Sequence, residues 1–163
     1  MKRLTLLLAN VVCASGFLHA QQMGDLSPAP AKPVGYVVFD AEPQVVKAGK
    51  ASVIELRFKV RDGFHVNSHT PKSDLLIPTV IKLDAAEGVK ASDVVYPAGT
   101  LYSFSFDPKE KLDVYTGTFV VKVPVVAAAG DHTLTGSLHY QACDTAACYP
   151  PKTLPLQVVF SAK

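Results

Sequence analysis

The residues with the clearest chemistry in this chain are two cysteines near its C-terminal end, Cys143 and Cys148. Four residues separate them, and the stiff sequence Tyr149-Pro150-Pro151 follows directly. This spacing allows a disulfide across a tight connection, provided that the two Cα atoms lie within about 7 Å of each other. Such a disulfide either staples a loop or exchanges electrons with a thiol of another protein.

The residues around the pair leave both uses open. Closing so short a loop contributes roughly 2 kcal/mol in the chain-entropy model, and a domain this rich in Val, Leu, Ile and Phe does not need it, which favours exchange. Exchange requires a reachable sulfur and a cysteine that ionises readily. However, Asp144 beside Cys143 opposes ionisation, and neither cysteine has a Lys or Arg next to it in sequence. The pair also lacks the Cys-x-x-Cys spacing of a thioredoxin helix.

Metal binding is a third hypothesis. His65 and His69, together with Cys143 and Cys148, offer the ligand types of a two-His, two-Cys site. The spacing of the histidines is not diagnostic outside a helix, and the two pairs are far apart in sequence. We therefore expect no bound metal and no cofactor. The sequence also carries no hydrolase triad and no phosphate-binding glycine loop.

The N-terminus indicates export. Lys2 and Arg3 precede a mostly apolar run over residues 4–12, a pattern typical of a secretory signal, which we place at residues 1–20. The run is shorter than the ~20 residues that a membrane span requires. Cys13 offers the alternative of a lipidation site, although the residue before it is bulkier than such sites have. An exported chain meets an oxidising compartment, where a cysteine pair this close forms a disulfide.

The charge of the chain argues for neither of two classes of partner. The full chain has a net charge of +2, and without Lys2 and Arg3 it has 14 basic and 14 acidic residues. A near-neutral mature chain with no basic tract does not favour nucleic acid or an anionic membrane surface. Residues 21–33, with three prolines, are expected to form an extended linker. We expect residues 34–163 to form one domain, without a membrane span.

The apolar pattern predicts strands and no helix. In residues 51–60, Ile54, Leu56 and Phe58 alternate with charged side chains, as expected of a half-buried strand. Residues 67–76 are expected to form a polar loop and residues 101–112 a loop rich in aromatic side chains. The remaining pattern, broken by glycine-containing turns, predicts an all-β fold, most simply an immunoglobulin-like antiparallel β-sandwich. The other strands are expected at residues 36–40, 77–83, 93–96, 118–125, 133–142 and 154–160.

The cysteine segment resembles a known family. Tyr140-Gln141-Ala142-Cys143, followed by Cys148-Tyr149-Pro150-Pro151, is similar to the signature of the N-terminal periplasmic domain of the thiol:disulfide interchange protein DsbD. Weaker likeness runs over residues 36–160. In this chain the cysteines are one residue closer together than in that family. The resemblance implies an immunoglobulin-like sandwich, here as a stand-alone chain without the membrane and thioredoxin-like domains.

The resemblance also implies a function. Domains of that family pass electrons between thioredoxin-like partners in the periplasm, so we expect thioredoxin-like proteins or domains as partners, with a membrane electron-transfer protein as a further candidate. Carried over, Cys143 and Cys148 form the exchanging pair; Cys148 attacks the partner and Cys143 resolves. An aromatic cap would shield the disulfide, with Phe106 the first candidate and Phe104 the second. The residues expected to line the site are His65, Asn67, Tyr140 and Tyr149, of which the first two stand where the family has tyrosines.

Overall fold

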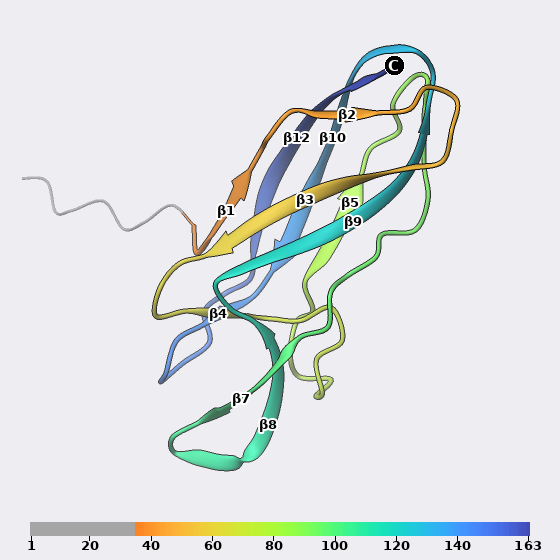
Figure 1. The fold of residues 1–163 in the computed structure, drawn as a ribbon. Helices are drawn as coiled ribbons and strands as arrows, with labels where there is room; N and C mark the ends of the chain where they lie inside the picture. Colours follow the sequence, from red (N-terminus) through yellow and green to blue (C-terminus); the bar gives the residue numbers. More distant parts are fainter. Residues whose placement is uncertain (1–34) are drawn as a thin grey trace, which may run out of the picture. The chain divides into compact units, whose positions relative to one another are not determined.

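The computed structural model describes residues 35–163, which form strands joined by turns and loops, with no helix among them (Figure 1). The expected signal at residues 1–20 and linker at residues 21–33 lie outside the described residues. Within residues 35–163, no helix is long and apolar enough to cross a membrane.

The first sheet has four antiparallel strands. Their order is β1 (Val37–Asp40), β3 (Ser52–Val60), β9 (Thr118–Ala127) and β6 (Val89–Ala91). On β3, the apolar residues of the predicted alternation are buried and the charged residues between them face outward or lie at the surface. The period of two therefore places one face of this sheet in the core, as the sequence predicts.

The second sheet faces the first. Its strand order is β2 (Gln44–Val46), β12 (Lys152–Ala162), β10 (Gly130–Tyr140) and β5 (Val80–Leu83). All its pairs are antiparallel except β2 with β12. Buried side chains of both sheets form one core cluster, including Phe58, Val121, Leu138 and Phe160. The predicted immunoglobulin-like sandwich is confirmed.

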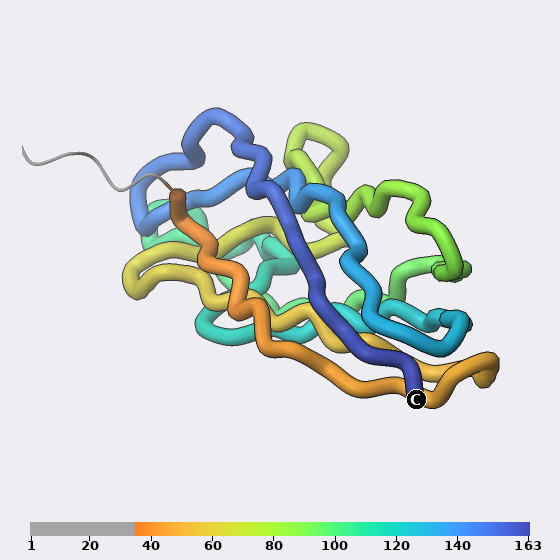
Figure 2. The backbone as a smooth tube through the Cα atoms, turned by 90° about the horizontal axis from the view of Figure 1, so that it is seen from above, coloured from red at the N-terminus to blue at the C-terminus, as the bar shows by residue number. Residues whose placement is uncertain are grey.

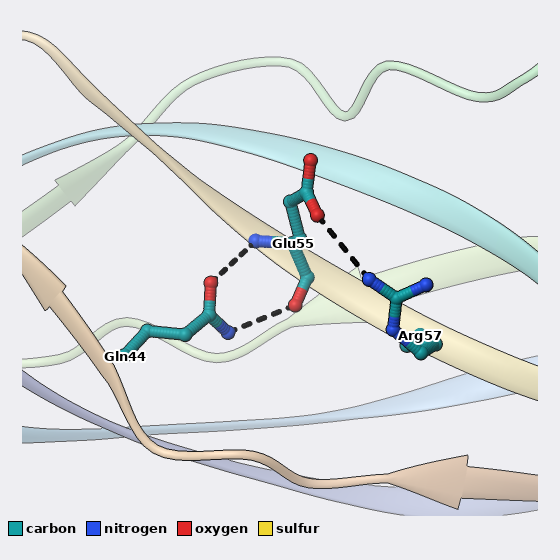
Figure 3. A network of polar contacts seen from close by, with 3 residues as sticks. All are labelled: Gln44, Glu55 and Arg57. Atoms are coloured by element: carbon teal, nitrogen blue, oxygen red, sulfur yellow. Dashed lines mark hydrogen bonds and ion pairs between the residues drawn. The ribbon is translucent and has the colours of Figure 1, made fainter.

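The chain changes sheets between β1 and β2, and a polar contact joins the two sheets there. The side-chain amide of Gln44 donates to the carbonyl of Glu55 and accepts from its N–H, each at 2.8 Å, as a neighbouring strand would (Figure 3). Arg57 lies 3.6 Å from the Glu55 carboxylate. Figure 2 shows β1 and β12 running alongside each other, so both ends of the described chain belong to the sandwich.

A third, smaller sheet is attached at one end of the sandwich. Its order is β11 (Ala142–Cys143), β4 (His65–Asn67), β8 (Asp107–Tyr115) and β7 (Thr100–Phe104). The hairpin of β7 and β8 projects at the end where β4 lies (Figure 1). This sheet, rather than the sandwich proper, carries the first cysteine.

Three sequence predictions need correction. Residues 101–112 belong to a β-hairpin and not to a loop. In the outer half of the hairpin, β7 and β8 pair with each other and the residues of β8 are exposed, so the sequence there is charged and shows no alternation of apolar and polar residues. Residues 93–96 make only a single bridge, Val95 with Lys122. The strand predicted to reach residue 142 breaks at Gln141, where the chain leaves the second sheet for the third.

Candidate functional site

The two cysteines lie in the connection between the longest paired strands. β10 and β12 pair along their whole length and end at Tyr140 opposite Lys152. Beyond that pair, Cys143 and Cys148 face each other in an isolated antiparallel bridge and form the predicted disulfide, with Cα atoms 3.9 Å apart. Cys143 is completely buried, whereas Cys148 is exposed. The two sulfur-bearing residues therefore have very different access to other molecules.

Asp144 organises the four residues between the cysteines. Its Oδ1 accepts hydrogen bonds from the N–H groups of Ala146 at 2.7 Å and Ala147 at 2.8 Å, as in an aspartate-initiated turn. Its Oδ2 accepts from the Tyr149 hydroxyl at 2.5 Å. The N–H of Tyr149 in turn donates to the carbonyl of Ala142 at 2.8 Å. One carboxylate thus fixes both the turn and the residue after Cys148.

These hydrogen bonds change two acid–base equilibria. The bond from Tyr149, followed by those from Ala146 and Ala147, holds the pKa of Asp144 below its usual value. The same Asp144 carboxylate raises the pKa of Tyr149, because the bond favours the protonated phenol. Asp144 is therefore a carboxylate and Tyr149 a phenol at neutral pH. The negative charge next to Cys143 disfavours a thiolate there, as the sequence indicates.

His65 lies directly across the strand pair from Cys143. β4 and β11 pair with Cys143 opposite His65 and Ala142 opposite Val66. The His65 ring is buried against the ring of Tyr102, with centroids 4.1 Å apart, and that of Phe104 at 5.9 Å. Burial lowers the pKa of His65, and the Asp144 charge opposes this shift only in part. The imidazole next to Cys143 is therefore neutral at neutral pH.

The aromatic hairpin reaches the site through Phe104 rather than through its tip. Phe104 is half-buried and contacts His65, while Phe106 stacks on Phe104 with centroids 4.8 Å apart. Phe106 itself remains 67% exposed. The two candidate cap residues thus form a short stack that begins at His65, the residue opposite Cys143.

Asn67 and Gln141 form a small hydrogen-bond network beside the cysteine connection. The buried Asn67 amide donates to the carbonyl of Ile77 at 3.0 Å and to Gln141 Oε1 at 3.1 Å. Gln141 Nε2 donates to the carbonyl of Tyr149 at 3.3 Å. Gln141 thus bonds both β4, through Asn67, and the residue that follows Cys148. Gln141 is a site residue that we did not single out from the sequence, although it stands in the Tyr-Gln-x-Cys pattern.

The two tyrosines expected at the site have different surroundings. Tyr149 stacks on Tyr36, with centroids 5.1 Å apart, and bonds Asp144. Tyr140 is buried, and its hydroxyl accepts a hydrogen bond from the N–H of Tyr36 at 3.2 Å. Tyr140 therefore supports the site from the core side through Tyr36. Tyr36 and Tyr102, which sequence patterns did not single out, lie far from the cysteines along the chain.

The four residues of the metal hypothesis do not converge. Cys143 and His65 are adjacent, but the His69 ring stacks on Tyr96, with centroids 3.7 Å apart, and its Nδ1 lies 3.0 Å from the carbonyl of Thr79. In residues 35–163, no three His, Cys, Asp or Glu side chains are grouped as a metal site would need.

Known proteins resemble this chain along most of its length. The sequence profile of "Thiol:disulfide interchange protein DsbD, N-terminal" matches residues 37–158. None of the curated proteins matches the chain. Among solved structures, the N-terminal periplasmic domain of ScsB from Proteus mirabilis is 14% identical with a TM-score of 0.51, over 75% of this chain and 44% of that one. That similarity shows the fold.

Two further structures come from Neisseria meningitidis. The reduced DsbD N-terminal domain is 21% identical with a TM-score of 0.45, over 71% of this chain and 86% of that one. The complex between the DsbD N-terminal and PilB N-terminal domains gives 19% identity and a TM-score of 0.48, over 79% of this chain and 88% of that one.

The Asp144 turn generates a prediction about pH. Because the pKa of Asp144 is lowered in the folded chain, the turn contributes stability above the ordinary carboxyl pKa and loses it as the pH falls through the lowered value. Tyr149→Phe removes the largest cause, so the Asp144 pKa should rise but stay below its ordinary value, because two backbone N–H donors remain. NMR titration of the Asp144 carboxyl carbon measures this directly.

Tyr36→Phe is the matched control, since it keeps the aromatic stack and leaves the bond between Tyr149 and Asp144 intact. Its Asp144 titration should match that of the unchanged protein. An identical Asp144 titration in Tyr149→Phe would show that the hydroxyl does not hold the turn.

Proposed function

Because this chain belongs to the family of the N-terminal domain of the thiol:disulfide interchange protein DsbD, we propose that its Cys143–Cys148 pair passes electrons between thioredoxin-like partners. The exchange is between proteins, with no cofactor. The observation that carries the proposal is the unequal access to the two cysteines, since Cys148 is exposed and Cys143 is completely buried.

Exchange requires that a partner can reach at least one of the two cysteines, and a staple has no such requirement. Thiol–disulfide exchange proceeds by in-line attack of a thiolate on one sulfur, so at least one sulfur must be reachable. A disulfide whose only use is to staple a loop is expected to have both cysteines buried. The exposure of Cys148 therefore supports exchange over the alternative of a non-catalytic interaction module with a structural disulfide.

The same asymmetry assigns the order of events when the domain is reduced. A donor thiolate attacks the Cys148 sulfur, a new bond joins Cys148 to the donor, and the bond between Cys148 and Cys143 breaks. Cys143 leaves with the electron pair and takes up a proton. The donor's second thiolate then attacks the donor's first sulfur, which is bound to Cys148 in the mixed disulfide, and releases Cys148. The donor ends as a disulfide and the domain as two thiols.

Reduction of an acceptor runs through the same residues. The Cys148 thiolate attacks the acceptor disulfide, one acceptor sulfur leaves as a thiolate, and the other is bound to Cys148. Cys143 loses its proton and attacks the Cys148 sulfur, which reforms the intramolecular disulfide and releases the second acceptor thiolate. Two electrons pass in each direction, and Cys148 makes every contact with a partner sulfur.

Compartment and partners follow from the chemistry. The signal predicted at residues 1–20 would export the chain to the periplasm, where a disulfide persists between exchange events. Thioredoxin-like proteins or domains present the paired cysteines that such exchange needs. A membrane electron-transfer protein is the further candidate for the donor, since electrons must reach this compartment from the cytoplasm.

A cap formed by Phe104 and Phe106 would limit adventitious exchange. Phe104 contacts His65 opposite Cys143, and Phe106 stacks on Phe104. An aromatic stack that begins at the residue opposite Cys143 would hinder small thiols that have no complementary surface, whereas a protein partner would displace the hairpin. The cap would thus favour exchange with protein partners over exchange with small thiols.

Trapping tests the function. Cys143→Ser leaves Cys148 able to attack a partner but removes the group that resolves the mixed disulfide. We expect this variant to accumulate a disulfide-linked complex with a thioredoxin-like protein, visible as a reducible band on non-reducing gels and identified by mass spectrometry. Cys148→Ser is the matched control and should trap far less, because Cys143 is buried.

Absence of any trapped thioredoxin-like protein with Cys143→Ser, in extracts of the source cells, would contradict the electron-transfer function. Equal trapping by Cys143→Ser and Cys148→Ser would contradict the assignment of Cys148 as the attacking cysteine.

Rates of reduction by a small thiol test the cap. Phe104→Ala and Phe106→Ala should each speed reduction of the disulfide by dithiothreitol several-fold, with the larger effect for Phe104→Ala, because Phe106 rests on Phe104. Leu101→Ala is the control, since Leu101 is exposed on the same hairpin and should leave the rate unchanged. Unchanged rates in both phenylalanine variants would show that the stack covers something other than the disulfide.

A further inference from the structure

His65 has an unused hydrogen-bonding nitrogen in a buried place. The residue is only 3% exposed, and its Nε2 has no hydrogen-bond partner. Leaving a buried polar group unpaired costs roughly 1–3 kcal/mol, and such groups in folded proteins call for an explanation. The fold therefore keeps a free imidazole nitrogen at a position where an apolar side chain would cost less.

Strand pairing places this imidazole beside Cys143. Residues directly opposite each other in an antiparallel pair project to the same face, with Cβ atoms about 4.5–5.5 Å apart. His65 and Cys143 are such a pair. Tyr102 and Phe104 pack against the ring, which keeps water from the imidazole and leaves Cys143 as its neighbour across the strands.

The other titratable groups around the imidazole are few. The cysteine loop contributes Asp144, whose charge acts on His65, and β7 contributes Tyr102. On β8, the next strand on the other side of β4, Tyr115 pairs with Val66 and so belongs to the opposite face. The Asp144 carboxylate accepts a thiol proton less readily than a neutral imidazole does at neutral pH.

Cys143 needs a proton acceptor inside the protein. To close the disulfide, its thiol must lose its proton, but the residue is completely buried and lies next to the negative Asp144. Burial and a like charge both disfavour a free thiolate. Removal of the proton during the attack, by a base already in place, avoids that intermediate.

We propose that the imidazole of His65 takes the proton of the Cys143 thiol when the disulfide closes and returns it when the disulfide opens. This assignment rests on the electron-transfer function proposed above. On closing, the bond between the Cys143 and Cys148 sulfurs forms, the acceptor sulfur leaves Cys148 with its electron pair, and the Cys143 proton moves to His65 Nε2. On opening, a donor thiolate binds Cys148, and imidazolium protonates the departing Cys143 sulfur.

The charge state of His65 agrees with this role. Burial lowers its pKa and Asp144 offsets the shift only in part, so the imidazole is an unprotonated base at neutral pH. Asp144 also favours the imidazolium that forms in the closing step. The same carboxylate that opposes a Cys143 thiolate thus assists transfer of the proton away from it.

The closing step can be measured without a protein partner. Reduced protein treated with dithiobis-nitrobenzoate releases one nitrothiolate when Cys148 reacts and a second when Cys143 closes the disulfide. In the unchanged protein the second phase should be nearly independent of pH between about 6.5 and 8, because neutral imidazole is the base. In His65→Gln it should be roughly a hundredfold slower at pH 7 and rise about tenfold per pH unit, as thiolate formation becomes limiting.

Controls separate this proposal from the function on which it rests. His139→Gln changes a half-buried histidine of β10 that contacts Thr153, and it should behave as the unchanged protein. Cys143→Ser should release only the first nitrothiolate. If the unchanged protein itself fails to release the second, both the electron-transfer function and the role of His65 are wrong.

If the unchanged protein closes rapidly but His65→Gln matches its rate and pH profile, only the proton-transfer role is overturned. If His65→Gln fails to fold, the pH dependence of the closing rate in the unchanged protein still tests the proton-transfer role. A tenfold rise in its closing rate per pH unit across the same range would show that no neutral imidazole takes the proton.

Discussion

The antiparallel pairing of Cys143 with His65 is the contact on which the rest of the site depends. It draws the chain out of the sandwich after Tyr140 and into a short strand on the third sheet, and in doing so buries the first cysteine completely. Cys148, joined to it by the disulfide, is exposed. A single backbone register thus places a buried cysteine opposite an imidazole and bonded to an exposed cysteine, and the proposed exchange rests on this arrangement.

The sandwich supplies the rigidity behind this arrangement. β10 and β12 pair over 11 residues each, so the cysteine connection is anchored on both sides by the most extensive pairing in the described chain. Within the connection, Asp144 fixes the turn, and Gln141 and Asn67 join it to β4. The aromatic hairpin is attached near its base, where β8 pairs with β4 over two residues and the Tyr102 and Phe104 rings pack on His65. Its exposed outer half suits the movable cover that we propose.

The local sequence pattern predicted the features that depend on neighbouring residues. The alternation of Ile54, Leu56 and Phe58 identified a sandwich strand, and the spacing of the cysteines identified the disulfide. The pattern missed the hairpin of residues 101–112, because its outer half is solvated on both faces and its strands gain order from each other rather than from the core. It also missed Gln141, Tyr36 and Tyr102, because their contacts join segments far apart in the chain. The metal hypothesis and the resemblance to a known family both grouped His65 with the cysteines, whereas the resemblance alone predicted Asn67 at the site.

The most direct test of the account is the reduction potential of the Cys143–Cys148 pair, measured by equilibrating the protein with graded ratios of reduced and oxidised thiol. We expect a value between about −180 and −270 mV, the range of thioredoxin-like exchange partners, which allows the pair to be both reduced and reoxidised by them. A value well below about −300 mV is typical of structural disulfides and would contradict the account, because it would make the bridge a permanent staple of an interaction module.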